Sequence, residues 1–381
     1  MIPFNKPYFT GKETIYIEQA VRSGKISGNG EFTKKCQQFF EEKYAIKKCL
    51  LTSSCTDALE MCAILAEIQD GDEVIVPSYT FVSTALAFVR QGAKIVFADS
   101  QIHHPNIDAD NLERLITSKT KAIVPVHYAG MACDMKKIMA LAEKYNLLVI
   151  EDAAQAVDAF YLDKQGSGSY KALGSIGHLG VFSFHETKNI ISGEGGMLAI
   201  NDRRFIHRAE IIWEKGTNRS DFFRGKVNKY GWVDIGSSFL PSEIVAAFLW
   251  AQIENLEDIQ RKRRVLWSAY YEGLKPLADK GFFQLPEIPD YSTNNSHIFY
   301  LVCNSFEERT KLIKHLEKND ILGVFHYLCL HSSDYYIQKH DGRRLENSDK
   351  FSDCLIRLPM FYELQMIDIK KIIKTIEINY I

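Results

Sequence analysis

Hydrophobic positions between residues 50 and 202 fall into short, nearly continuous runs separated by segments of helical period. The runs are DEVIVPSY (72–79), AKIVFAD (93–99), KAIVPVHYAG (121–130), LLVIEDAA (147–154), LGVFSFH (179–185) and GMLAIND (196–202). Between them lie segments such as MKKIMALAEKYN (135–146), in which Ile138, Leu141 and Ala142 repeat at helical spacing. Strands that alternate with helices form a mainly parallel sheet covered on both faces. The pattern predicts a large α/β domain.

A second pattern begins after Pro241. Residues 242–277 read as one long helix, followed by a strand at HIFYLVCN (297–304) and a helix at FEERTKLIKHLEKND (306–320) that Ser305 caps. We therefore expect a large α/β domain with an N-terminal arm over residues 1–250. A linker helix and a small α+β domain are expected over residues 251–381.

The composition excludes several classes of function. The chain has 381 residues, of which 46% are hydrophobic and 25% charged, with a formal net charge of −2. Basic residues are spread along the chain, which argues against a nucleic-acid or membrane partner. The apolar runs are too short to span a bilayer, and MIPFNKPYFTGKE lacks the layout of a signal peptide. We expect a cytoplasmic protein with eight reduced cysteines, no disulfide and no metal, because the sequence contains no C-x-x-C pair.

Two polar groups stand at predicted strand ends, where open α/β sheets gather their ligands. Glu151 and Asp152 end the LLVI run, and either could cap a helix or pair with a cation. Ser53, Ser54 and Thr56 precede a helical segment, where free N–H groups and the helix dipole favour an anion. Ordinary helix capping explains that second group equally well.

Two further features lie at equivalent places in the pattern. Tyr79 and Phe81 stand where a strand turns into a helix, and could be core residues or a flat surface for a ligand ring. Lys188 lies between an apolar strand that contains Ser183 and the glycine cluster GEGG. A lone lysine in a loop is usually solvated. Four such features in one plan favour a shared ligand.

Pyridoxal 5′-phosphate (PLP) accounts for all four features. Its aldehyde needs a sheltered lysine, its ring nitrogen a carboxylate, its phosphate a hydroxyl-rich helix N-terminus, and its ring a planar neighbour. Thr56, Phe81, Asp152 and Lys188 would supply one group each. The first strand–helix unit lacks G-x-G-x-x-G, which argues against a nicotinamide-dependent dehydrogenase.

The chain resembles the sugar-nucleotide aminotransferases of the DegT/StrS type nearly end to end, from MIPFNKP to RLPMFYEL. The motifs that carry the resemblance are SFHETKNIISGEGG (183–196), EKGTNRSDFFRG (214–225), DIGSSFLPSE (234–243) and VFHYLCLH (324–331). The resemblance implies the aspartate aminotransferase architecture, which is fold type I of the PLP enzymes. It also points to a subgroup that aminates C4 of a dTDP-4-keto-6-deoxyhexose, such as dTDP-4-keto-6-deoxy-D-glucose.

The resemblance also implies roles for individual residues. Lys188 would bind PLP covalently and carry the proton. Asp152 would pair with the ring nitrogen, Gln155 would lie near the phenolic oxygen, and Phe81 would cover the ring. Cys55, Thr56 and Ser183 would hold the phosphate. Position 188 is lysine, with His185 three residues earlier, whereas a dehydratase offshoot of the family has histidine in place of the lysine. Transamination is therefore the expected reaction.

Two departures from the family pattern matter. Where relatives have Gly-x-Asn-x-Arg, this chain has Gly236-Ser237-Ser238-Phe239-Leu240. Ser238 would reach the phosphate of the neighbouring subunit with a shorter arm, and no arginine stands at position 240. The stretch 161–178 is longer than expected, and we interpret it as a surface loop near the substrate entrance.

L-glutamate is the amine donor that the resemblance implies, and the expected assembly is a homodimer with shared active sites. The anionic groups of both substrates need fixed cations, for which Arg219 and Arg224 are the candidates. Tyr327 and His331 would line the sugar side. Two other hypotheses stay open: a fold-type-I lyase or desulfurase that uses Cys55 or Cys329, and a non-catalytic PLP-binding regulator.

Overall fold

The computed structural model describes residues 1–163 and 170–380. Part of the expected surface loop, residues 164–169, lies outside this range. On either side of that part, β6 (Phe160–Leu162) and β7 (Tyr170–Ala172) pair in antiparallel register.

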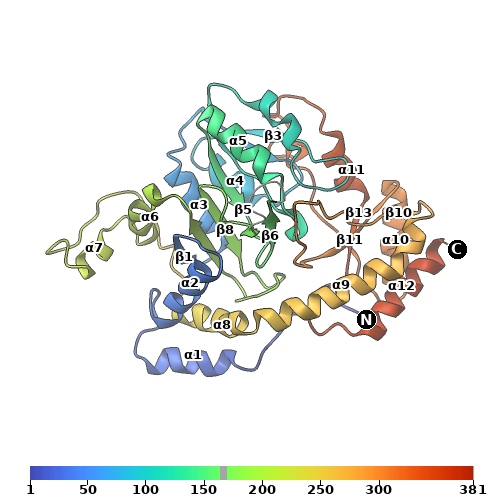
Figure 1. Cartoon of the computed structure of the whole chain (residues 1–381), viewed down its shortest axis with the longest axis horizontal. Helices are drawn as coiled ribbons and strands as arrows, with labels where there is room; N and C mark the ends of the chain where they lie inside the picture. The colour runs from blue at the N-terminus through green and yellow to red at the C-terminus, as the bar shows by residue number, and fades with distance from the viewer. Residues whose placement is uncertain (164–169, 381) are drawn as a thin grey trace.

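A seven-stranded sheet forms the centre of the large domain (Figure 1). Its strands are β1 (Lys48–Thr52), β2 (Glu73–Pro77), β3 (Lys94–Ala98), β4 (Thr120–Ile123), β5 (Leu148–Asp152), β8 (Leu179–Ser183) and β9 (Gly196–Ile200). They follow the order β1-β9-β8-β5-β4-β2-β3, and β9 alone runs antiparallel to its neighbours. The mostly parallel sheet predicted from the sequence is confirmed. β1 was not predicted, because its apolar run, Cys49–Leu51, is only three residues long.

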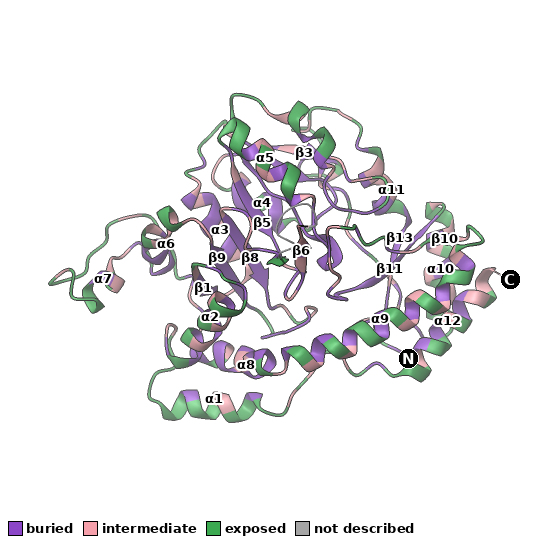
Figure 2. Ribbon diagram, in the orientation of Figure 1, coloured by how far each residue is buried: buried purple, intermediate pink, exposed green. Residues whose placement is uncertain are grey.

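Helices cover both faces of this sheet, as the near-continuous burial of its strands requires. The helices are α2 (Glu31–Lys43), α3 (Cys55–Leu65), α4 (Ser83–Val89), α5 (Met135–Tyr145) and α6 (Ile206–Trp213). Neighbouring residues of a strand point to opposite faces: Val74 and Val76 pack with α3 and α4, whereas Ile75 packs with α2 and α5. Figure 2 shows the strands as the most deeply buried part of the molecule.

The small domain contains a four-stranded antiparallel sheet with helices on one side. Its elements are β10 (Phe283–Gln284), β11 (Phe299–Cys303), β12 (Val324–Phe325), β13 (Leu355–Leu358), α10 (Phe306–Lys318), α11 (Glu346–Cys354) and α12 (Met366–Tyr380). The strand order is β10-β11-β13-β12. Ser305 caps α10 as predicted, because its hydroxyl accepts a hydrogen bond from the Glu308 N–H at 3.2 Å.

The single long helix expected over residues 242–277 is two helices, α8 (Glu243–Glu254) and α9 (Leu256–Ala278). They separate at Asn255, whose side-chain amide bonds back to the Ala251 carbonyl at 2.9 Å. That local bond competes with the helical pattern and could not be recognised from periodicity. The expected domain boundary at residue 250 falls inside α8. Along α9, Ile259 still packs in the large domain, and Leu266 packs in the small one.

The first residues of the chain form an arm that reaches the small domain before α1 (Glu13–Arg22) begins. Ile2 makes an isolated parallel bridge to Ile321, and the Phe4 carbonyl accepts a hydrogen bond from the Met360 N–H at 3.2 Å. At the opposite end of the molecule, α7 (Arg219–Phe223) projects away from the central sheet (Figure 1). None of the described helices combines the length and apolar character needed to cross a bilayer.

Candidate functional site

A buried carboxylate stands at the carboxyl end of β5. Asp152 accepts a hydrogen bond from the Thr84 hydroxyl at 2.7 Å and from the Ala154 N–H at 3.1 Å. Thr84 lies in the first turn of α4 and also bonds to the Thr80 hydroxyl at 3.0 Å. These two donors fix the position of the carboxylate. Asp152 is thus ready to accept one more donor.

Lys188 lies in the loop between β8 and β9, in the same half of the sheet. Its side chain is half-buried, and in the part of the chain that the structure describes no carboxylate lies within ion-pair distance of it. Burial lowers the pKa of Lys188 below its ordinary value, while Cys55 and Asp152 act in the opposite direction. A lysine of this kind gives up its proton more easily than a solvated one and can act as a nucleophile or base.

The residue next to the lysine is anchored by a buried amide network. Asn189 donates to Gln260 at 2.7 Å and to the Asn295 carbonyl at 3.0 Å, and its own oxygen bonds to His297 Nδ1 at 2.8 Å. These partners lie on α9 and on the chain that enters β11, so the network joins the lysine loop to the linker helix. It restricts the backbone from which Lys188 extends.

The N-terminus of α3 supplies free donors beside these two residues. Ser54 caps the helix by accepting from the Asp57 N–H at 3.0 Å, while the N–H groups of Cys55 and Thr56 find no acceptor in the described chain. The Thr56 hydroxyl bonds to Ser83 at 2.8 Å. Burial raises the pKa of the Cys55 thiol, with Asp152 adding to the rise and Lys188 opposing it. Those two charges therefore lie close to the start of α3, where an anion would bind.

Aromatic side chains from both domains border this group. Phe81 is 56% exposed and lies 6.2 Å, between ring centroids, from Tyr327 of the small domain. Gln155 bridges the domains, because its oxygen accepts from the Ala129 N–H at 2.7 Å and its amide donates to the Tyr327 hydroxyl at 3.0 Å. Tyr327 has a left-handed backbone with φ of 54° and stacks on His326 at 3.5 Å. The structure thus brings Phe81, Gln155 and Tyr327 together.

Three other residues expected at the site have partners of their own. His331 is buried against Ser78, with 2.7 Å between Nδ1 and the hydroxyl, and burial lowers the pKa of its imidazole. Ser183 is buried and accepts from the His185 N–H at 3.4 Å, and it pairs in register with Gly196, which packs against the start of α3. Ser238 is exposed and pairs with Glu214 at the base of the α7 projection, which we define as residues 214–238.

Arg219 and Arg224 lie on the α7 projection itself, which extends away from the central sheet (Figure 1). Arg224 makes two hydrogen bonds of 2.6 Å to the Glu210 carboxylate. Arg219 is looser, 3.9 Å from Glu214, with its guanidinium over the Phe223 ring. Within one chain neither arginine contributes to the cleft around Lys188.

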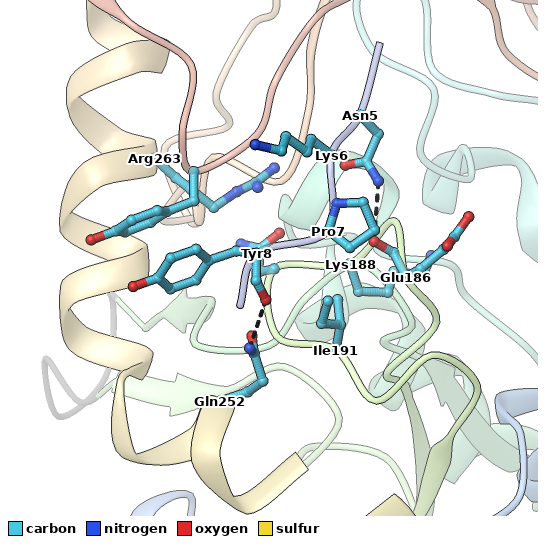
Figure 3. Close-up of a pocket in the computed structure, with 11 residues that line it drawn as sticks. Asn5, Lys6, Pro7, Tyr8, Glu186, Lys188, Ile191, Gln252 and Arg263 are labelled. Carbon is cyan, nitrogen blue, oxygen red and sulfur yellow. Dashed lines mark hydrogen bonds between the residues drawn. The ribbon is translucent and has the colours of Figure 1, made fainter. Parts of the chain in front are cut away.

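The N-terminal arm passes directly beside the lysine loop, which was not expected from the sequence. Figure 3 shows Asn5, Pro7 and Tyr8 beside Glu186, Lys188 and Ile191, with which they line a small open pocket. The Asn5 amide donates to the Glu186 carbonyl at 3.1 Å, and Tyr8 stacks on Tyr362 of the small domain at 3.9 Å. The arm therefore closes one side of the site.

These residues fit PLP in their donor chemistry. Asp152 is held by two donors and has no cation, Lys188 is a half-buried amine without a counterion, and α3 begins with two unused N–H groups. Gly196 is needed for this arrangement: a Cβ there would lie 2.4 Å from the Cys55 nitrogen, so β9 could not approach the start of α3. Thr84 and Asn189 escaped the sequence analysis, since no motif distinguishes a bonded threonine or asparagine from a solvated one.

Comparison with known proteins agrees with this chemistry. Residues 8–377 match the family described as DegT/DnrJ/EryC1/StrS aminotransferases. Over 98% of its length the chain is 30% identical to the spore coat polysaccharide biosynthesis protein SpsC of Bacillus subtilis, covering 96% of that protein. It is 32% identical to the GDP-perosamine synthase of Escherichia coli O157:H7, covering 89% of each chain. Among solved structures, Spr1654 of Streptococcus pneumoniae in its PMP form has a TM-score of 0.89 at 25% identity, covering 100% of this chain and 99% of that one.

Proposed function

The chain belongs to the DegT/DnrJ/EryC1/StrS family of PLP-dependent aminotransferases, and we propose that it transfers an amino group from L-glutamate to C4 of dTDP-4-keto-6-deoxy-D-glucose. The product would be dTDP-4-amino-4,6-dideoxygalactose, a precursor of surface polysaccharides. The protein would then be a dTDP-4-amino-4,6-dideoxygalactose transaminase. The observation that carries the proposed chemistry is Lys188, a half-buried amine with a lowered pKa and no carboxylate partner in the described chain.

PLP, when bound, would supply an electron sink for the carbon that loses or gains the amino group. Lys188 would hold it and move the proton at that carbon, because burial lowers the pKa of the lysine and so favours release of its proton. Asp152 would face the ring nitrogen, with Thr84 keeping the carboxylate in position. The donors at the start of α3 would bind the phosphate. The aromatic pair Phe81–Tyr327 and the N-terminal arm would exclude water from the cleft.

The choice of sugar rests on the motifs SFHETKNIISGEGG, DIGSSFLPSE and VFHYLCLH. A second candidate is amination of another nucleotide-linked 4-ketosugar. The relative named GDP-perosamine synthase favours this candidate, because its name refers to a GDP-linked sugar and it is 32% identical to this chain. A few different contacts in the substrate pocket are enough to change the preferred nucleotide or the C4 stereochemistry.

A homodimer with shared sites would give the α7 projection a role. It carries exposed aromatic residues, with Phe223 71% exposed and Trp232 85% exposed. An exposed apolar patch of this kind usually marks an interaction surface. We propose that Ser238, Arg219 and Arg224 lie at the cleft of the neighbouring subunit. Arg219, which has only a 3.9 Å contact to Glu214, would meet the substrate's anionic groups, and Arg224, paired with Glu210, would hold the projection in place. A mixture of inactive Lys188→Ala and Ser238→Trp subunits should regain part of the activity by forming one intact site, and no recovery despite subunit exchange would reject sharing.

The test of function uses purified protein loaded with PLP. Its visible absorption should bleach on addition of L-glutamate and return on addition of dTDP-4-keto-6-deoxyglucose, and Lys188→Ala should show neither change. The same measurement with GDP- and UDP-linked 4-ketosugars identifies the preferred nucleotide. Bleaching that only another nucleotide reverses selects the second candidate. No bleaching by any amino donor would reject the aminotransferase activity, as a regulator predicts, and release of sulfide or of an elimination product would select the lyase.

A further inference from the structure

The small sheet presents one arginine, Arg357, to the large domain. Arg357 on β13 pairs directly with Tyr300 on β11, so both side chains lie on the same face of the sheet. The Tyr300 ring lies 5.8 Å from Tyr128 of the large domain. The opposite face carries Phe299, which stacks on Tyr270 of α9 at 5.0 Å. Arg357 therefore points into the cleft between the domains.

This guanidinium is only partly engaged. One terminal nitrogen donates to the Phe325 carbonyl at 3.2 Å, and the group lies over the Phe4 ring at 4.6 Å. Its Nε is buried without a hydrogen-bond partner, and no carboxylate of the described residues lies within ion-pair distance. Arg263, the other buried arginine nearby, donates instead to three backbone carbonyls. An arginine with an unused donor in a half-buried cleft is suited to an anionic ligand.

Arg357 lies close to the reactive lysine. Phe4, on which its guanidinium packs, is followed by Asn5, which bonds to the carbonyl of Glu186 two residues before Lys188. Burial is the largest cause of the lowered pKa of Lys188, and the positive charge of Arg357 adds to it. The same charge helps to keep the neighbouring His326 neutral, again after burial. An anion bound to Arg357 would thus lie within electrostatic reach of Lys188.

We infer that Arg357 binds a carboxylate of the amino-acid donor. This rests on the proposed aminotransferase function and makes it more specific. In an α-amino acid one carbon separates the amine from the carboxylate, so an amine at Lys188 places its carboxylate nearby. In a nucleotide-linked 4-ketosugar the diphosphate is attached at C1, across the sugar ring from C4. A cation beside the lysine therefore suits the donor, whereas one farther out, such as Arg219, suits the nucleotide.

The fork of Arg357 can bind both oxygens of a carboxylate at once. Arg357→Lys would keep the positive charge but lose the two-pronged donor geometry, whereas Arg357→Gln would lose both. The two variants should therefore weaken donor binding to different degrees. Arg309→Gln is the matched control, because Arg309 also has a buried Nε without a partner and packs over Phe306 at 4.8 Å. Arg309 extends from α10 toward Phe325 (5.9 Å), the partner of Ile356, on the opposite face of the sheet.

The experiment measures donor binding apart from sugar chemistry. Isothermal calorimetry gives the Kd of glutarate, an unreactive dicarboxylate, for each PLP-loaded protein, and the bleaching rate gives the apparent Kd of L-glutamate. For Arg357→Gln both constants should rise about 10- to 100-fold, the loss expected for hydrogen bonds to a charged group. Arg357→Lys should fall between that variant and the wild type, and Arg309→Gln should bind as the wild type does.

A second measurement separates this role from nucleotide binding and from misfolding. In protein already converted to the pyridoxamine form, the KM for the nucleotide ketosugar should change less than about twofold in Arg357→Lys, and its melting temperature should match that of Arg309→Gln. Unchanged donor constants in both Arg357 variants would overturn the inference. So would an equal loss for donor and ketosugar. Failure of the wild type to react with glutamate would instead reject the proposed function.

Discussion

The α7 projection and the cleft around Lys188 differ in whether their cationic side chains are paired with carboxylates. On and beside the α7 projection every arginine has a carboxylate: Arg208 contacts Asp234 at 2.7 Å, Arg224 contacts Glu210 at 2.6 Å, and Arg219 lies 3.9 Å from Glu214. In the cleft, Lys188 and Arg357 lack a carboxylate among the described residues. Asp152, whose charge acts on Lys188, is bonded to Thr84.

This difference shows which positive charges are available to bind a ligand. A paired cation on a surface contributes little to stability and can give nothing to a ligand without losing its partner. An unpaired, partly buried cation costs stability, and such a cost persists at sites that bind or react. We therefore expect substitutions in the cleft to change the chemistry of the same subunit. Substitutions in the projection should change stability, association or substrate binding in a neighbouring subunit.

The largest effect should come from the lysine. Lys188→Ala removes the group that holds PLP and moves the proton, and the proton-transfer role alone is worth about 10²–10⁴-fold. Turnover should fall by at least that factor, while the circular dichroism spectrum and the melting temperature of the protein stay close to those of the wild type. Retention of more than a few per cent of activity would remove Lys188 from the centre of the cleft.

The carboxylate should come next. Asp152→Asn keeps the shape and removes the negative charge that would face the ring nitrogen. We compare it with Thr84→Val, which removes one hydrogen bond to that carboxylate, an interaction worth about 1.5–3 kcal/mol, or roughly 10- to 100-fold in rate. The kcat of Asp152→Asn should fall further than that of Thr84→Val. A near-normal kcat in Asp152→Asn would show that the acid is structural.

The projection offers a matched pair of arginines. Arg224→Gln removes a bidentate partner of the buried Glu210 and should lower the free energy of unfolding by about 1 kcal/mol, because the arginine itself is half-exposed. Arg219→Gln loses only a 3.9 Å contact and should unfold like the wild type. If the projection serves a neighbouring cleft, Arg219→Gln should instead raise the KM for the nucleotide sugar a few-fold. Equal melting temperatures and equal KM values in both variants would contradict this division of roles.

The smallest effect concerns pH in the cofactor-free protein. Burial lowers the folded-state pKa of Lys188 below its ordinary value of 10.5, so the folded protein binds that proton less tightly than the unfolded chain does. Below the folded pKa the whole cost of burying the charge is present, and above pH 10.5 it is gone.

Lys188→Met should therefore be more stable than the wild type at pH 7, with the difference in melting temperature shrinking as the pH approaches 10.5. The other lysines titrate in both proteins and cancel in that difference. A gap that is independent of pH would show that folding does not shift the pKa of Lys188, and that methionine stabilises the protein through packing alone.

Much of the fold could be predicted because its elements are local. Alternation of buried runs with helical period identified the parallel sheet, and strand ends identified Asp152 and the start of α3. The break at Asn255 was missed because one side-chain bond decides it. Arg357 was missed as well, although an arginine inside the apolar run Leu355–Leu358 was a usable signal. Its role became visible only when the structure placed it opposite Tyr128, more than two hundred residues earlier in the sequence.

The N-terminal arm has a consequence for synthesis on the ribosome. Its residues are made more than three hundred residues before the groups that hold it: Ile321, Met360 and Glu363, the last paired with Lys6 at 2.7 Å. Translation proceeds at about 5–20 residues per second, so the arm must wait unpaired while most of the chain emerges. The wall of the cleft beside Lys188 can then form only after the small domain, up to Glu363, has emerged. A nascent chain that still lacks the small domain would thus be unable to close its cleft, and completion of the working site follows the synthesis of that domain.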